Sequence, residues 1–210
     1  ALSDRTSLDE ALQVFAYREE LWTRVQKWQD AEHGWLTASF SDLDVQSIGE
    51  TVTTYLKVAH KLYKQYKEPL VLETLQESAD RYHQWMPPLL DLGNPAMQRR
   101  HWKVIFEHLG VPAPTEFSLQ DLIDWKVFEN RTVITETSAI ASGEWSLAQS
   151  LRKVEKSMAA ASFTLAEYCG VPILTGVDDL YEALEENKMT LQIMRSSRFI
   201  DGVKQDVETW

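Results

Sequence analysis

Apolar residues in this 210-residue chain recur at intervals of three and four over most of its length, and this spacing predicts long amphipathic helices. The pattern is clearest from Val45 onward, where apolar side chains return every three or four positions until Pro69 halts it. Glycine and proline are correspondingly scarce, with 8 and 7 copies. Barrels and phosphate-binding loops use both residues in their turns, so the scarcity disfavours those folds.

Helix-capping residues indicate where the helices begin. Ser7 and Glu10 form a capping box for the first helix, which is expected to bury Trp22 and Trp28 and to stop near Gly34. Further helices are expected at Asp44, from Pro69 to Pro87, at Ser118, over 131–142, over 145–160 and at Asp178.

The segment 94–110 has the best-defined helix ends. Asn94 is expected to be the N-cap, Pro95 the first helical residue and Gly110 the residue just past the end. Within it, residues 99–102 read Arg-Arg-His-Trp. A guanidinium pair beside a buried indole is typical of a helix anchored to its neighbours, and a ligand-binding role is the alternative.

The apolar spacing changes after residue 160. Residues 163–168 alternate and residues 171–174 are short and β-branched between glycines, which predicts a small β-hairpin. Cys169 is expected to be a buried structural thiol. The last apolar residues, Val203, Val207 and Trp210, keep helical spacing up to the final position, so we expect the chain to be a piece of a longer protein.

The net charge limits the classes of partner. Acidic residues outnumber basic ones by 32 to 21, which gives −11 at pH 7. This sign disfavours nucleic acid and anionic membrane surfaces as partners. No apolar run approaches the roughly 18 residues of a membrane-spanning helix. A single cysteine cannot form an internal disulfide, which favours a reducing intracellular setting.

Motifs of catalysis and cofactor binding are missing from the sequence. The closest approach to a phosphate-binding loop, Gly170 to Gly176, has the wrong spacing and lacks the lysine. Asp80 and His83 can project together from one helix, as a surface pair or, less favourably, as part of a metal site. We therefore expect no catalytic residue, no metal and no cofactor in this segment.

Lysines form a basic stripe on the helix that follows Asp44, at Lys57, Lys61 and Lys64. One interpretation is a solvated helix face. The other is a docking patch for an acidic protein surface, which would make the chain an α-helical adaptor or scaffold module.

Residues 89–102 read Leu-Leu-Asp-Leu-Gly-Asn-Pro-Ala-Met-Gln-Arg-Arg-His-Trp and resemble the signature of the linker region of dynein heavy chains. The matching family motif is carried by Asn94, Pro95, Arg100, His101 and Trp102. Further landmarks follow in the family's order at 117–119, 141–144, 163–165, 173–179, 194–199 and Trp210. The spellings Gly-Val-Asp-Asp and Ser-Arg-Phe resemble axonemal heavy chains.

The resemblance implies a mainly α fold, an elongated stack of antiparallel helical bundles with one small hairpin near 163–174. Residues 1–110 would form the first bundle and 111–210 the second, truncated at its C-terminal end. The function implied is a mechanical linker that changes position on an AAA+ ring with ATP state, in a minus-end microtubule motor of cilia or flagella. ATP and magnesium would be bound elsewhere in the parent protein. The implied partners are the ring of the same heavy chain, microtubules through the parent, and dynein intermediate or light chains, in the cytoplasm, cytoskeleton and axoneme.

Overall fold

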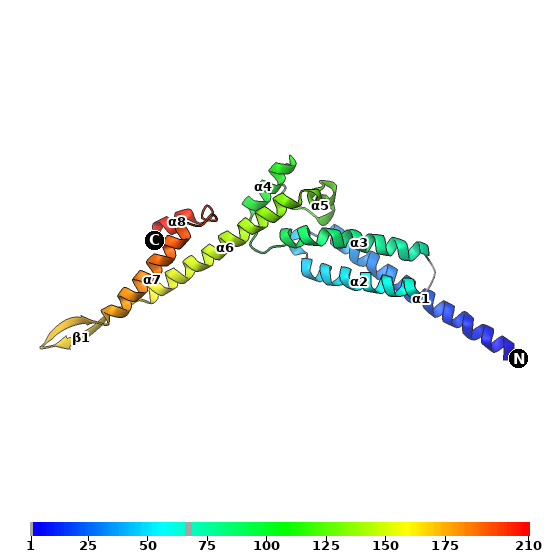
Figure 1. Cartoon of the computed structure of the whole chain (residues 1–210), viewed down its shortest axis with the longest axis horizontal. Coiled ribbons are helices and arrows are strands. Elements are labelled where there is room, and N and C mark those ends of the chain that lie inside the picture. The colour runs from blue at the N-terminus through cyan, green and yellow to red at the C-terminus, as the bar shows by residue number, and fades with distance from the viewer. Residues whose placement is uncertain (1, 66–68) are drawn as a thin grey trace. The chain divides into compact units, whose positions relative to one another are not determined.

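The computed structural model describes residues 2–65 and 69–210, apart from the side chains of residues 2–7, 64–65 and 69–70. The described residues form helices and one two-stranded sheet, which confirms the prediction of a mainly α chain with a small hairpin (Figure 1). The elements are α1 (Leu2–Thr37), α2 (Val45–Gln65), α3 (Pro69–Leu92), α4 (Arg99–Leu109), α5 (Leu119–Asp124), α6 (Arg131–Ala160), β1 (Thr164–Tyr168), β2 (Val171–Thr175), α7 (Val177–Arg195) and α8 (Lys204–Thr209), with short 3-10 turns at Phe40–Asp42 and Val127–Glu129.

The chain packs into two compact units. The first unit comprises residues up to Gly93 together with Trp102–Thr135, and the second comprises Asn94–His101 together with Glu136–Trp210. Helices α4 and α6 therefore contribute residues to both units. The domain boundary expected at residue 110 stays a prediction, because packing units need not coincide with domains.

Aromatic side chains fill the core between α1, α2 and α3 in the first unit. The Trp28 ring lies 5.6 Å from the Trp35 ring, 5.1 Å from the Tyr55 ring and 5.8 Å from the Tyr82 ring. Its indole Nε1–H donates to the hydroxyl of Ser78 at 3.2 Å, so burial leaves no unpaired donor there. This cluster confirms the predicted burial of Trp28, which is 2% exposed.

The predicted burial of Trp22 is wrong, because its side chain is 56% exposed. From residue 8 onward, the buried side chains of α1 are Tyr17, Leu21, Val25 and Trp28. Trp22 directly follows Leu21 and so points about 100° away around the helix. Helix α1 also begins before Ser7 and ends after Gly34, because neither residue interrupts its backbone hydrogen bonds.

Helix α3 continues through Pro87 and Pro88 to Leu92, although the sequence predicted that it would end at these prolines. A proline within a helix leaves the carbonyl four residues earlier without its donor. For Pro88 that carbonyl belongs to Gln84, and the guanidinium of Arg131 donates to it at 3.3 Å. A tertiary contact thus replaces the lost helical hydrogen bond.

A second aromatic cluster of the first unit surrounds Trp102. Its ring lies 5.4 Å from the Phe40 ring, 5.9 Å from the Phe106 ring and 4.8 Å from the Phe117 ring. These rings join α4 to the loops before α2 and α5. The helix start predicted at Ser118 is confirmed, and Ser118 forms a capping box with Asp121 at the start of α5.

Helix α6 is one continuous helix, whereas the sequence predicted two, separated near Gly143. Gly143 lies between the two predicted segments, and a Cβ atom there would overlap the ring of Phe199. The glycine therefore provides space for an aromatic side chain and leaves the helical backbone intact. Buried apolar residues hold α6 to α7 and α8 in the second unit, namely Leu151, Met194, Val203 and Val207.

The predicted hairpin is confirmed, with β1 and β2 antiparallel and joined by a two-residue turn at Cys169 and Gly170. Both turn residues have positive φ, 54° and 78°, as a type I′ turn requires. Cys169 is exposed, which corrects the expected burial of its thiol. The N-cap position of α7 is occupied by Gly176, and Asp178, which was expected to cap this helix, lies in its first turn.

Candidate functional site

Residues 94–98 form a turn before α4, where the sequence predicted that the helix would already have begun. The Oδ1 of Asn94 accepts from the backbone N–H of Ala96 at 3.0 Å, and its carbonyl accepts from Met97 at 2.9 Å. Helix α4 begins only at Arg99. The prediction of Asn94 as N-cap and Pro95 as first helical residue is therefore wrong, because the same residue types also stabilise a turn.

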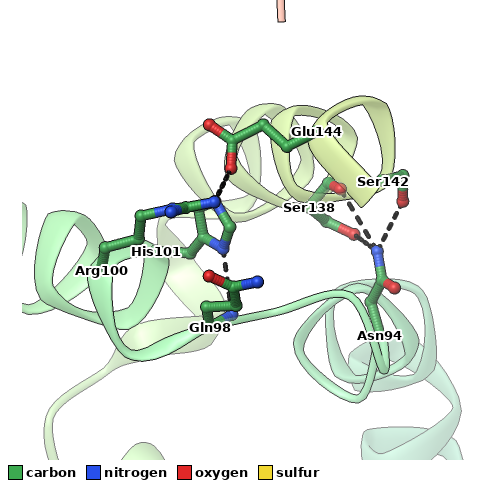
Figure 2. Close-up of polar contacts among 7 residues, drawn as sticks. All are labelled: Asn94, Gln98, Arg100, His101, Ser138, Ser142 and Glu144. Atoms are coloured by element: carbon green, nitrogen blue, oxygen red, sulfur yellow. Dashed lines mark hydrogen bonds and ion pairs between the residues drawn. The ribbon is translucent and has the colours of Figure 1, made fainter. Parts of the chain in front are cut away.

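The side-chain amide of Asn94 attaches this turn to α6 within the second unit. Its Nδ2 lies 3.0 Å from the hydroxyl oxygen of Ser138, 3.2 Å from the Ser138 carbonyl oxygen and 2.7 Å from the Ser142 hydroxyl oxygen (Figure 2). The two serines are one helical turn apart and present their acceptors on the same face. Asn94 thus uses its oxygen to close the turn and its nitrogen to bind the helix.

His101 binds the start of α4 and the middle of α6 at the same time. Its Nδ1 accepts from the backbone N–H of Gln98 at 3.0 Å, and its Nε2 lies 2.9 Å from the Oε2 of Glu144 (Figure 2). Because Nδ1 accepts a hydrogen bond, the neutral ring carries its hydrogen on Nε2 and donates it to the carboxylate. The imidazole side chain is 6% exposed, so both bonds are shielded from water.

Glu144 receives a second donor, the guanidinium of Arg100. The carboxylate side chain is 9% exposed, whereas that of Arg100 is 47% exposed. Gly202 closes the remaining side, since a Cβ at that position would overlap both the Glu144 carboxylate and the Arg100 guanidinium. The buried carboxylate is therefore paired, hydrogen-bonded and tightly enclosed, as a buried charge must be.

The chemistry of this cluster, which we call the 94–101 junction, is that of a structural connection. Both ring nitrogens of His101 are already bound to protein atoms, so the ring has no free nitrogen for proton transfer. Among the described residues, no group of three or more histidine, cysteine, aspartate or glutamate side chains is placed to hold a metal ion. No helix in the described part of the chain is long and apolar enough to cross a bilayer.

The structure brings together three of the five predicted motif residues at α6, namely Asn94, Arg100 and His101. Pro95 is exposed within the turn, and Trp102 belongs to the aromatic cluster of the first unit. The partners Ser138, Ser142, Glu144 and Gly202 were not predicted as part of this site. These partners lie more than 40 residues from the motif along the chain, so no local sequence pattern links them to it.

The basic stripe is described only in part. Lys57 and Lys61 are exposed and lie one turn apart on α2, while the side chain of Lys64 lies outside the described residues. The docking role of these lysines stays a prediction.

Comparison with known proteins identifies the family. Residues 8–210 match the family described as "Dynein heavy chain, N-terminal region 2". The chain is 26% identical over 197 residues to "Dynein-1-beta heavy chain, flagellar inner arm I1 complex" of Chlamydomonas reinhardtii, covering 92% of this chain and 4% of that protein. It is 28% identical over 210 residues to human "Dynein axonemal heavy chain 6", covering 97% of this chain and 5% of that protein.

The chain is also 26% identical over 199 residues to human "Dynein axonemal heavy chain 2", covering 91% of this chain and 4% of that protein. The chain thus spans about one twentieth of the length of the curated relatives that it matches. Since the family match covers nearly every residue, this chain belongs to the dynein heavy chain family, in the part described as N-terminal region 2.

Proposed function

We propose that this chain is a mechanical linker segment of a dynein heavy chain, which changes position on the AAA+ ring of the same heavy chain as ATP is bound and hydrolysed. The observation that carries the proposal is the family match over residues 8–210. ATP and magnesium act in other parts of the parent protein. The names of the relatives support a place in the axoneme of cilia or flagella, where the parent would move along microtubules.

A linker must keep its internal packing under load, because a soft lever would absorb the movement that it should transmit. The packing of the first unit suits this role, since aromatic rings contact one another around Trp28 and around Trp102. The 94–101 junction contributes in the second unit. Separating it exposes the paired groups of His101 and Glu144, so small distortions meet resistance from directional hydrogen bonds.

Motility of the intact heavy chain tests the proposal. We would introduce Glu144→Ala, which removes the acceptor of the junction, and Glu136→Ala, which changes an exposed glutamate of the same helix. The expected result is slower microtubule gliding with Glu144→Ala and preserved basal ATP hydrolysis, because the lever softens while the nucleotide sites lie elsewhere.

The control variant should glide at the wild-type speed. Hydrogen exchange of α6 in the assembled motor shows whether the variant segment is still folded. A folded Glu144→Ala motor that glides at the wild-type speed, or one that loses ATP hydrolysis in parallel with gliding, would contradict a mechanical role.

A further inference from the structure

The hairpin of β1 and β2 presents apolar side chains that no other described element covers. It projects beyond the ends of α6 and α7 in the second unit (Figure 1). The exposed fractions are 66% for Leu165, 68% for Tyr168 and 59% for Val171. An isolated two-stranded hairpin is marginally stable in water, and exposed apolar strands of this kind mark interaction sites.

The two edges of the hairpin differ in what they offer to another strand. Tyr168 and Val171 flank the two-residue turn and are hydrogen-bonded to each other. Along each strand from this pair, residues whose backbone N–H and C=O point toward the partner strand alternate with residues whose groups point away from it. The next pair, Glu167 and Pro172, therefore directs its backbone groups outward. Proline has no N–H, which blocks the edge of β2 at that point.

The edge of β1 keeps its full set of backbone groups. Its outward N–H and C=O groups belong to Leu165 and Glu167, which lie on the strand opposite Leu174 and Pro172. An unblocked edge is the template on which an added strand forms its hydrogen bonds. The edge of β1 is therefore the better template for an added strand.

Charge indicates which kind of strand this edge accepts. Residues 161–187 contain no lysine, arginine or histidine. Their acidic side chains are all exposed and comprise Glu167, Asp178, Asp179, Glu182, Glu185 and Glu186. Glu167 lies on β1 itself, and Asp178 and Asp179 lie in the first turn of α7, which directly follows β2. A cationic partner is attracted and oriented by this surface, and an acidic partner is repelled.

We propose that the edge of β1 binds an extended strand of another protein chain that carries lysine or arginine side chains. A second copy of this chain would bring the same acidic surface against itself, which charge repulsion opposes. Within the described residues there is no further strand to occupy the edge, since β1 and β2 pair with each other. The basic stripe at Lys57 lies on a helix and offers no strand edge.

Hydrogen exchange and cross-linking of the intact heavy chain in its native complex test this proposal. We expect the amides of Leu165 and Glu167 to exchange at least about tenfold more slowly than the amide of Leu174, because only the β1 edge is covered. With a photoreactive phenylalanine in place of Tyr168, we expect cross-links to a segment of another chain that contains lysine or arginine. Equal exchange at the three amides would overturn the proposal, as would cross-links that reach only the hairpin of a second copy or only the same heavy chain.

Two proline substitutions separate the edges. Glu167→Pro removes an outward N–H from β1 and should abolish the protection of Leu165. Leu174→Pro makes the matched change on β2 and should leave that protection unchanged. The inward amides of Ala166 and Tyr168 report whether the hairpin is still paired in each variant. If both variants keep the pairing and both leave Leu165 protected, the proposed edge is wrong.

Discussion

The substitution Glu144→Ala should destabilise the second unit strongly, because it removes a buried acceptor of hydrogen bonds. It leaves the Nε2–H of His101, which is 4% exposed, without an acceptor. A buried donor left unpaired costs about 1–3 kcal/mol. The loss of the Arg100 contact adds at most about 1 kcal/mol, because that guanidinium is nearly half exposed and water can replace the carboxylate.

We therefore expect a total loss of about 1–4 kcal/mol of local stability. The control Glu136→Ala removes an exposed carboxylate from the same helix and should change stability by no more than about 0.5 kcal/mol. Native-state hydrogen exchange is the suitable assay, because it reports the local opening free energy of α6 and of the Gln98 amide. Urea denaturation with a single probe would average over the two packing units.

A double-mutant cycle with His101→Ala isolates the pair. If the His101–Glu144 hydrogen bond is the dominant contact, the two substitutions together cost less than their sum, with a coupling energy of about 1 kcal/mol or more. The reasoning is refuted if the two effects simply add, or if Glu144→Ala costs no more than the Glu136→Ala control.

Three further predictions concern glycines, an alkaline transition and a helix cap. Gly143→Ala should lower the opening free energy of α6 by about 1–3 kcal/mol because its Cβ meets a packed ring, whereas Gly34→Ala, with open space around it, should raise that of α1 by about 0.5–1 kcal/mol. Native-state hydrogen exchange measures both, and equal effects would contradict the packing argument. Burial, followed by the nearby Glu32 carboxylate, raises the pKa of Tyr82 above its usual value, so folding stability should fall as the pH rises above about 10. Tyr82→Phe should reduce that loss in urea melts, and part of it should remain because burial also raises the pKa of Tyr55. Ser118→Ala should cost about 1 kcal/mol at neutral pH. The Ser118 backbone N–H, followed by its hydroxyl, lowers the pKa of Asp121. The stability difference between wild type and Ser118→Ala should therefore shrink in acid as the Asp121 carboxylate is protonated. A stability difference that does not depend on pH would argue against the capping box.

Helix starts were predictable where the signal is local. Asp44 caps α2 by accepting from the backbone N–H groups of Gln46 and Ser47, and Ser118 caps α5. Both interactions lie within three residues of chain. The same local reasoning failed at Asn94, where the side chain closes a turn instead, because turns and helix starts use the same residue types.

The contacts that a residue makes across the fold were beyond local patterns. Gly143 lies between two predicted helical segments that form one helix in the structure. Its contact with the ring of Phe199 explains why a glycine occupies this position. Helix α3 passes Pro88 because Arg131 supplies a donor from elsewhere in the chain. Only part of the 94–101 junction was predictable. The sequence indicated Arg100 and His101 as motif residues, but their acceptor Glu144 lies more than 40 residues away along the chain.

Distance measurements between this segment and the ring test the proposed linker function most directly. A donor fluorophore at the exposed position Arg152 of α6 and an acceptor in the AAA+ ring of the intact heavy chain would report energy transfer in each nucleotide state. We expect a clear change in transfer efficiency between the nucleotide-free motor and the motor trapped with ADP and vanadate, because a linker has different contacts with the ring in the two states. Several acceptor positions that all give the same efficiency in both states would contradict the proposed movement.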